Sequence, residues 1–203
     1  MITAAEALER LKVGNERFVA GNSQHEEMSS EKRRQLVVAE QKPFAVILGC
    51  SDSRVPAEIV FDQGLGDLFV IRVAGNIVAP SQVGSIEFAV EQFGTPLVVV
   101  LGHSNCGAIK STIDVIRGNV DSSSHNLNSI VSRIRPVIET LCESNISEDE
   151  EELKKYSIRA NVRASVGHIR YSSPILEKLV QQERVTVVGA EYSLETGVVN
   201  FID

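Results

Sequence analysis

Four short runs of apolar residues dominate the hydrophobic pattern along this chain. They are rich in Val and Ile and are mostly bounded by Gly or Pro. Continuous apolar runs of this length are typical of strands that are buried on both faces, as in a parallel sheet covered by helices. The pattern therefore predicts a mainly parallel central sheet, built from "FAVILG" (44–49), "DLFVIRV" (67–73), "PLVVVLG" (96–102) and "RVTVVGAEY" (184–192).

Segments with helical periodicity separate these runs. "VGSIEFAVEQF" (83–93) and "CGAIKSTIDVI" (106–116) are two of them, and helical patterns fill most of residues 124–182. Strands that alternate with helices indicate crossover connections and the α/β fold class. The last segment, "ETGVVNFID" (195–203), is expected to turn back from the final strand as a hairpin, because its Thr-Gly pair is compatible with a turn.

The N-terminal forty residues predict two helices. Thr3 and Glu6 have the spacing of a capping box, and the apolar residues after them recur with a helical period to about Gly21. A second helix is expected over Ser30 to Glu40. It should end before Pro43, because the residue before a proline disfavours helical geometry. Neither predicted helix contains a motif that indicates a catalytic or binding role.

The acidic run "SEDEEE" (147–152) is expected to open an exposed helix with Ser147 as its cap, because carboxylates suit the first turn of a helix. We find no repeat and no longer low-complexity tract. The chain, residues 1–203, is therefore expected to form one domain with one core.

Composition and charge exclude several classes of function. The 203 residues are 43% apolar and 23% charged, as in an ordinary soluble globular protein. The formal net charge of −7 argues against nucleic-acid binding, and the one dense basic cluster, "EKRRQ" (31–35), is interpreted as a solvated helix face. No apolar stretch is long enough to span a membrane, and the N-terminus does not resemble a signal peptide. A cytoplasmic location is the default expectation.

Two short motifs bring chemistry to the sheet. "GCSDSRVPAE" (49–58) places Cys50 directly after the first apolar run, and "GHSNCG" (102–107) places His103 directly after the third. The carboxyl ends of parallel strands meet at one edge, where ligands bind in folds of this class. We therefore expect the two motifs to lie close together.

These motifs together supply a possible metal site. His103 and Cys106 have an H-x2-C spacing, and Cys50 adds a second thiol, which gives three ligands of the kind that Zn²⁺ favours and leaves a fourth position open. Taken singly, a buried cysteine can be an apolar filler and an H-x2-C pair can arise by chance. Their joint placement favours a catalytic zinc site, whereas Cys142 is interpreted as helix packing.

Asp52 and Arg54 alternate with Cys50. Alternate residues of an extended segment point the same way, so the two are expected to form a charge-assisted pair. Asp52 can then ligate zinc, or accept a hydrogen bond from zinc-bound water while Arg54 holds it. The alternative is a plain surface salt bridge, worth at most about 1 kcal/mol.

The order and spacing of "CSDSR", "DLFVIRVAGN" and "GHSNCG" closely resemble those of the β-class carbonic anhydrases, from about Gln41 to Ile116. The resemblance implies that Cys50, His103 and Cys106 bind zinc. It also implies that Asp52 and Arg54 form the catalytic dyad and that zinc hydroxide attacks CO2 to give bicarbonate.

The resemblance also implies substrate contacts and an assembly. Gly107 matches a backbone amide that lines the site, and Gln41 matches a glutamine that reaches substrate across a dimer interface. Phe69 and Phe88 match aromatic residues of the substrate pocket, although plain core packing is an equally good interpretation. An N-terminal helical arm, about residues 1–40, would embrace a second subunit in a homodimer, or in a tetramer or larger assembly.

Some members of the family have a closed state in which the residue matching Asp52 ligates zinc. Bicarbonate promotes it in some of them through a Trp, Arg and Tyr pocket. Arg72 and Tyr192 match two of these residues, but Ile47 stands at the Trp position and the chain has no Trp. The resemblance therefore does not support bicarbonate-driven closure, and leaves pH-driven closure open. No proton shuttle is identified, because the three remaining histidines are interpreted as exposed or structural: His25, His125 and His168.

Two other functions fit parts of the pattern. Relatives that hydrolyse carbonyl sulfide or carbon disulfide keep the zinc ligands, but nothing in residues 41–110 looks remodelled for those substrates. A non-enzymatic zinc protein would normally close its site with a fourth Cys or His. The sequence favours carbon dioxide hydration over both.

Overall fold

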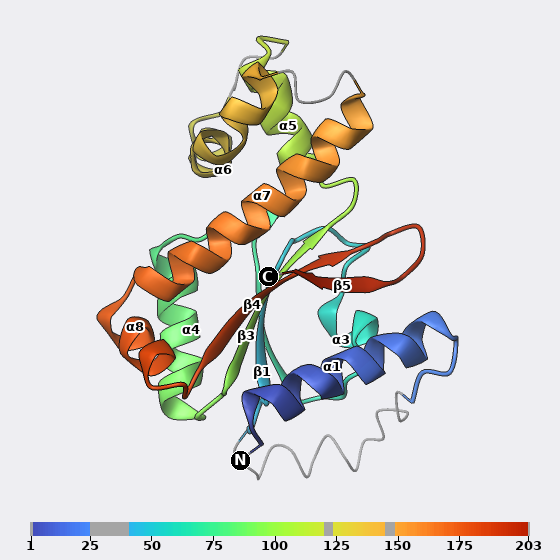
Figure 1. Ribbon diagram of the computed structural model, residues 1–203, viewed down its shortest axis with the longest axis vertical. Helices are drawn as coiled ribbons and strands as arrows, with labels where there is room; N and C mark the ends of the chain where they lie inside the picture. Colours follow the sequence, from blue (N-terminus) through green and yellow to red (C-terminus); the bar gives the residue numbers. More distant parts are fainter. Residues whose placement is uncertain (1, 25–40, 120–123, 145–148, 203) are drawn as a thin grey trace.

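The structure is a computed structural model that describes residues 2–24, 41–119, 124–144 and 149–202. Its centre is a five-stranded sheet in the order β2-β1-β3-β4-β5, in which β5 alone is antiparallel to its neighbour (Figure 1). The four predicted strands, the terminal hairpin and the α/β class are confirmed. The strands are β1 (Ala45–Gly49), β2 (Leu68–Arg72), β3 (Leu97–His103), β4 (Thr186–Tyr192) and β5 (Val199–Ile202).

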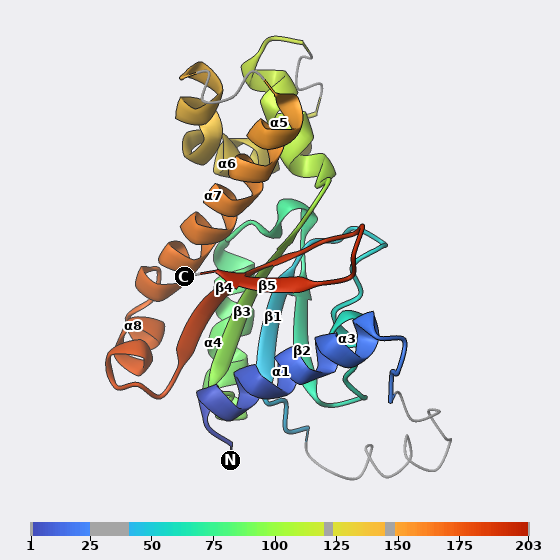
Figure 2. The same cartoon turned by 45° about the vertical axis from the view of Figure 1, so that its right-hand side comes forward.

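Helices cover both faces of this sheet and its carboxyl end. One face carries α4 (Pro80–Gln92), α7 (Glu150–Tyr171) and α8 (Pro174–Gln181), and the other carries α1 (Ala4–Val19) and α3 (Ala57–Val60) (Figures 1 and 2). Beyond the carboxyl ends of the strands lie the 3₁₀ turn η1 (Ala74–Asn76), α5 (Gly107–Ile116) and α6 (His125–Glu143).

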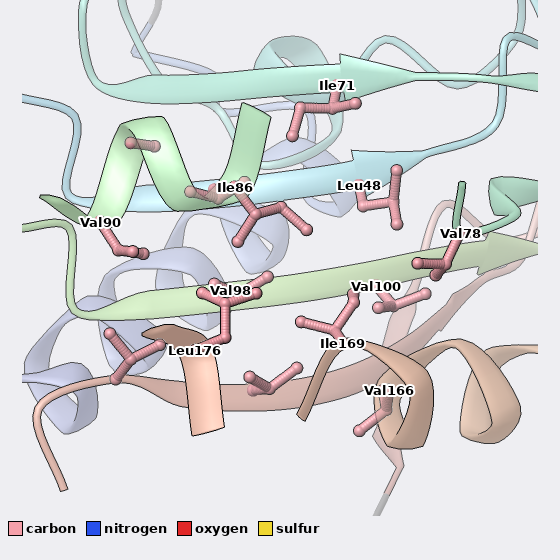
Figure 3. Close-up of a cluster of buried hydrophobic side chains, with 14 of the residues drawn as sticks. Leu48, Ile71, Val78, Ile86, Val90, Val98, Val100, Val166, Ile169 and Leu176 are labelled. Carbon is pink, nitrogen blue, oxygen red and sulfur yellow. The ribbon is translucent and has the colours of Figure 1, made fainter. Parts of the chain in front are cut away.

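Side chains of the central strands alternate between the two covered faces of the sheet, which explains why the strand sequences are continuously apolar. Val46 and Leu48 of β1 face the cluster under α4, α7 and α8, while Ala45 and Ile47 face the cluster under α1. Successive side chains of a strand point to opposite faces, so a strand covered on both sides needs apolar residues at every position. Figure 3 shows the first cluster, with side chains of the sheet meeting those of the three helices.

Two glycines let α7 cross close to the sheet. A Cβ on Gly102 of β3 would lie 2.5 Å from Cγ2 of Val162, and a Cβ on Gly189 of β4 would lie 2.8 Å from its Cγ1. Neither contact is tolerable, so larger residues would push the helix outwards. This close approach brings α7 over the end of β3, where His103 lies.

The ends of several elements differ from the predicted boundaries. The capping box of Thr3 is present, but α1 ends at Val19, before Gly21. The helix opened by the acidic run begins at Glu150 with Asp149 as its cap, instead of Ser147, which lies outside the described residues. The predicted helix over residues 30–40 also lies outside them.

The described half of the N-terminal arm packs on its own chain. Ala7 and Leu11 of α1 are fully buried against the sheet. Contact of residues 1–40 with a second subunit stays a prediction, as does a single domain over residues 1–203. Among the described helices, none has the length and hydropathy that crossing a membrane requires.

Leu176 and Leu127 offer a matched test of this core. Leu176 of α8 is 0% exposed and Leu127 of α6 is 59% exposed. Leu176→Ala should lower the free energy of unfolding by about 2–5 kcal/mol because it removes core contacts and leaves a cavity. Leu127→Ala should change it by no more than about 0.5 kcal/mol. Urea denaturation followed by circular dichroism measures both, and equal effects would contradict the assigned packing of α8.

Candidate metal centre

Three side chains of the kind that bind zinc meet at the carboxyl edge of the sheet. Cys50 directly follows β1, His103 is the last residue of β3, and Cys106 caps the N-terminus of α5. Their ligand atoms all lie within 4.8 Å of one another, and all three residues are buried. The structure therefore brings together the three predicted metal ligands as a group that can hold an ion.

The turn between His103 and Cys106 is held from outside by Glu195. Asn105 has a left-handed backbone with a φ of 57°, which bends the chain so that both ligands can face one centre. Ser104 Oγ and Asn105 Nδ2 each donate a 2.8 Å hydrogen bond to the Glu195 carboxylate. Sequence reasoning missed Glu195, since it lies about ninety residues from the turn and belongs to no motif.

His103 presents one nitrogen to the two cysteines. Its Nδ1 lies 2.8 Å from the Ser104 carbonyl oxygen, which can only accept, so in the neutral ring Nδ1 carries the proton and Nε2 carries a lone pair. Nε2 is buried and has no hydrogen-bond partner among the described residues. A buried polar atom without a partner is costly. A metal ion bound by this nitrogen fits the arrangement.

The two cysteine thiols shift each other's pKa. A hydrogen bond from Cys106 is the main reason why the pKa of the Cys50 thiol falls to about 4, with His103 and the Gly75 amide also contributing. The same interaction with Cys50, together with burial, raises the pKa of Cys106. Burial opposes protonation of His103, but the Cys50 sulfur outweighs it and the pKa of His103 is raised. Metal binding here must release protons.

The predicted Asp52–Arg54 pair forms, although the segment is a turn instead of an extended strand. Val55 N–H donates to the Asp52 carbonyl oxygen, and this turn folds Arg54 back on Asp52. Arg54 donates from its backbone N–H and its Nε to Oδ1, at 3.0 and 2.9 Å, and from an Nη to Oδ2 at 2.7 Å. These bonds are the main reason why the pKa of Asp52 is lowered.

Asp52 lies at the edge of the metal group. Its Oδ2 is 3.9 Å from His103 Nε2. Because Arg54 keeps this carboxylate ionised, Asp52 can act only as a hydrogen-bond acceptor beside the three ligands. A salt bridge on an open surface would not have this neighbour, so the geometry favours the functional interpretation of the pair.

Arg72, Tyr192 and Ile47 were assigned by resemblance to a possible closure pocket. Arg72 donates hydrogen bonds to the backbone carbonyls of Cys50 and Asp52, so it supports the loop that carries the ligand and the dyad. Ile47 and Tyr192 are buried in the core under α1. The arginine therefore already has backbone partners.

The predicted substrate residues divide into two groups. Gly107 directly follows Cys106, and a Cβ added there would meet nothing within 4 Å, so its backbone borders open space beside the site. Gln41 is exposed and precedes β1, at the opposite edge of the sheet from Cys50. The structure brings Gly107 to the metal group but not Gln41.

Phe69 and Phe88 also lie away from the metal group of their own chain. Their rings are 6.3 Å apart and pack in one aromatic cluster with Phe93. Phe69 precedes Arg72 by three residues, which places it about 10 Å back along β2. Phe88 is 51% exposed. Within one chain, core packing explains Phe69, and the exposed ring of Phe88 is available to another molecule.

The other described candidates, His125, His168 and Cys142, do not join the metal group. His125 begins α6 and His168 is exposed on α7, while His25 lies outside the described residues. Cys142 packs against the apolar cluster formed by α5, α6 and α7, as its interpretation as helix packing requires. It is not part of the metal-binding group found among the described residues.

Comparisons with known proteins agree on one family. A family model described as "Carbonic anhydrase" matches residues 45–199. Carbonic anhydrase 2 of Mycobacterium tuberculosis is 39% identical over 191 residues, covering 94% of this chain and 89% of that protein. A carbonic anhydrase of Mycolicibacterium smegmatis is 40% identical over 193 residues, with the same coverage of both chains.

Solved structures of β-carbonic anhydrases share the fold. The enzyme CafA of Aspergillus fumigatus superposes with a TM-score of 0.76 at 24% identity, covering 98% of this chain and 90% of that one. A β-carbonic anhydrase described as tetrameric, from Sordaria macrospora, has a TM-score of 0.76 at 21% identity and covers 97% of each chain. At these identities the likeness concerns the fold.

The hydrogen bonds from Ser104 and Asn105 to Glu195 should make the stability of the folded protein depend on pH. Hydrogen bonds, first that from Ser104, lower the pKa of Glu195 below its unfolded value of about 4.3. Its contribution to stability is therefore present above that value and is lost as the pH falls through the folded-state pKa. Because Glu195 is exposed to solvent, Glu195→Gln should lower the free energy of unfolding of the metal-free protein by less than about 1 kcal/mol at neutral pH, with the difference shrinking below about pH 4.

Urea denaturation at a series of pH values measures this difference. Glu58→Gln, which removes the same charge from an exposed position, is the control and should show no such trend. A Glu195→Gln effect that is constant through the acid range, or matched by Glu58→Gln, would show that the carboxylate does not hold the turn.

Proposed function

This chain belongs to the β-class carbonic anhydrase family, and we propose that it catalyses the reversible hydration of CO2 to bicarbonate and a proton, with Zn²⁺ held by Cys50, His103 and Cys106. Family membership makes it a lyase, a carbonate dehydratase. The single observation that carries the zinc proposal is the buried group of two sulfurs and one imidazole nitrogen, which has no hydrogen-bond partner among the described residues.

The donor set fits Zn²⁺ better than a hard cation. Two thiolate sulfurs and a neutral imidazole are borderline or soft ligands, and Mg²⁺ or Ca²⁺ would require oxygen atoms. When bound by three protein ligands with a fourth position open, Zn²⁺ supplies a nucleophile by acidifying water. A structural site would normally have a fourth Cys or His, and the group among the described residues has only three members.

Asp52 and Arg54 form the proposed catalytic dyad. An ionised carboxylate accepts hydrogen bonds and cannot donate them. Asp52 therefore favours a nucleophile that still carries a proton. The hydrogen bond that Asp52 accepts from this nucleophile orients the lone pair of the nucleophile towards CO2. Arg54 holds both oxygens of Asp52 through three hydrogen bonds. This fixes the carboxylate in place before substrate arrives, which is where most of the advantage of a preorganised site lies.

The closed state, in which Asp52 itself ligates Zn²⁺, stays a prediction. To reach it, Asp52 would have to give up its bonds to the Arg54 side chain. Bicarbonate-driven closure is not part of the proposal, because Ile47 replaces the tryptophan and Arg72 is engaged by backbone carbonyls. A cytoplasmic location also stays a prediction.

A complete active site is proposed to need a second copy of the chain. Gln41 lies before the first residue of β1, and Cys50 lies after its last, so about 17 Å of strand separates them. Gln41 can contact substrate only in the site of another subunit, and the exposed ring of Phe88 is likewise available to a partner. We therefore propose a homodimer, or a tetramer built from dimers, with Gln41, Phe69 and Phe88 completing the neighbouring pocket.

Zinc content and CO2 hydration measured on the same samples test the assignment. Cys50→Ser should lose bound zinc and activity, because it removes one of three ligands, whereas Cys142→Ser should keep both. Asp52→Asn should keep zinc but lower kcat/KM by about 10- to 100-fold, the usual effect of losing a group that orients a metal site. Inductively coupled plasma mass spectrometry and stopped-flow hydration provide the two readouts.

Full activity of Asp52→Asn would remove the dyad from the mechanism. Wild-type protein that carries zinc but hydrates no CO2 would overturn the proposed function altogether. Release of sulfide from carbonyl sulfide or carbon disulfide by that protein would instead support a related hydrolase on the same scaffold.

Mixed dimers test whether Gln41 acts across an interface. Alone, Cys50→Ser should be inactive and Gln41→Ala should be weakly active. In a dimer of one of each, the intact metal group faces the intact Gln41, so an equal mixture after subunit exchange should recover about a quarter of the wild-type sites. A mixture no more active than the average of its two components would contradict the shared site.

A further inference from the structure

Three polar side chains form a buried stripe on α7. Ser157, Asn161 and Ser165 recur every four residues and are 0%, 3% and 5% exposed. Residues at this spacing share one face of a helix, and the apolar residues beside them, Ile158 and Val162, pack in the core. Burying polar groups in such surroundings is unfavourable unless they are hydrogen-bonded. The stripe therefore requires an explanation that core packing does not supply.

Two members of the stripe bind the turn η1. Asn161 Nδ2 donates a 2.9 Å hydrogen bond to the carbonyl oxygen of Gly75, and Ser165 Oγ donates a 3.2 Å bond to that of Asn76. Both residues of the turn have left-handed backbones, with φ values of 69° and 43°. Asn76 is a non-glycine residue in this region, so its conformation depends on contacts that hold it there.

The opposite side of the same turn faces the metal group. The backbone N–H of Gly75 donates to Cys50 Sγ across 3.4 Å. A Cβ on Gly75 would lie 2.8 Å from Ile134 Cδ1 and 3.0 Å from the Cβ of Ala108, which is two residues beyond Cys106. Gly75 is thus wedged between α5, α6 and α7, with its carbonyl oxygen held by Asn161 and its N–H aimed at Cys50.

We propose that Asn161 and Ser165 are positioning residues for the metal centre, which aim the Gly75 N–H at the Cys50 sulfur by holding the two carbonyls of η1. The inference rests on the proposed function, because it assumes that Cys50 is a metal ligand. Neither side chain touches the reacting atoms, and both act through the backbone of the turn.

An amide aimed at a thiolate changes its properties as a ligand. A hydrogen bond to a charged acceptor is stronger than one between neutral groups, so it stabilises the thiolate form that binds metal. It also draws electron density from the sulfur, which leaves a bound metal more electron-poor. Partners of metal ligands typically contribute 10- to 100-fold in metal affinity or activity. Purely structural anchors would contribute to folding without this effect.

The stripe contains its own matched control. Ser157 is as deeply buried as Ser165 on the same helix, and its Oγ has no hydrogen-bond partner among the described residues. Ser165→Ala and Ser157→Ala each delete one serine hydroxyl, at positions eight residues apart on α7. Only Ser165→Ala removes a hydrogen bond to η1. Asn161→Leu removes the stronger contact while keeping a similar side-chain volume.

Metal affinity is the first readout. Competition with a chromogenic chelator should give a Zn²⁺ dissociation constant about tenfold higher for Asn161→Leu than for wild type. We expect a smaller increase for Ser165→Ala and no change for Ser157→Ala. If Asn161→Leu does not fold, the comparison of the two serine variants decides. Equal affinities for Ser165→Ala and Ser157→Ala would overturn the proposal.

Spectroscopy of protein loaded with cadmium or cobalt in place of zinc is the second readout. Its signals would not depend on Ser165 if that residue were only a structural anchor. In cadmium-loaded protein, the Gly75 amide proton should show scalar coupling to the metal through the Cys50 sulfur, and Ser165→Ala should weaken that coupling relative to Ser157→Ala. The sulfur-to-metal charge-transfer band of cobalt-loaded protein should shift in the same order. Absence of the coupling in wild type would overturn the proposal.

Failure of this inference is distinguishable from failure of the proposed function. If wild type binds zinc and Cys50→Ser does not, the metal site stands, and unchanged affinity in Asn161→Leu counts against the positioning role alone. If Cys50→Ser binds zinc as tightly as wild type, Cys50 is not a ligand, and both the site and the inference fail.

Discussion

The register between β1 and β3 is the constraint on which the site depends. Gly49 pairs with Leu101, so Cys50 leaves the sheet beside the strand that ends at His103. A shift of one residue would turn every side chain of β1 to the other face and move Cys50 away from the imidazole. The apolar residues on both faces of these strands prevent that shift, because each is matched to a different core. Packing far from the site thus decides whether the ligands can meet.

Hydrogen bonds from outside the ligands make this edge rigid. Arg72 binds the carbonyls of Cys50 and Asp52, and Glu195 holds the turn after His103. Arg54 fixes the carboxylate of Asp52. Each of these residues is charged and lies near the protein surface, where an exposed ion pair contributes little to stability. Their value lies in geometry, because each restrains backbone or side-chain positions that the metal group needs.

Local patterns in the sequence were enough to find the strands, most of the helices and the three candidate ligands, because each of those signals is contained in one short stretch of the chain. The conformation around Asp52 was predicted wrongly: Arg54 reaches it through a turn, and residue spacing alone cannot distinguish a turn from an extended segment. Glu195 and Asn161 were invisible, since they act on loops far away in the chain through single hydrogen bonds. Contact of Gln41 with a second subunit stays a prediction, because the structure of one chain does not test it.

Metal binding and loop anchoring address different parts of one energetic problem. Without metal, the site buries two cysteine sulfurs and an imidazole nitrogen that has no hydrogen-bond partner among the described residues. Binding an ion relieves that burden, and its free energy is added to the stability of the folded chain. An ion attracts its ligands from many arrangements, however, and does not by itself choose among them. The choice must be made by contacts that exist before it binds, which here come from Glu195 on the outer side and from α7 on the inner side.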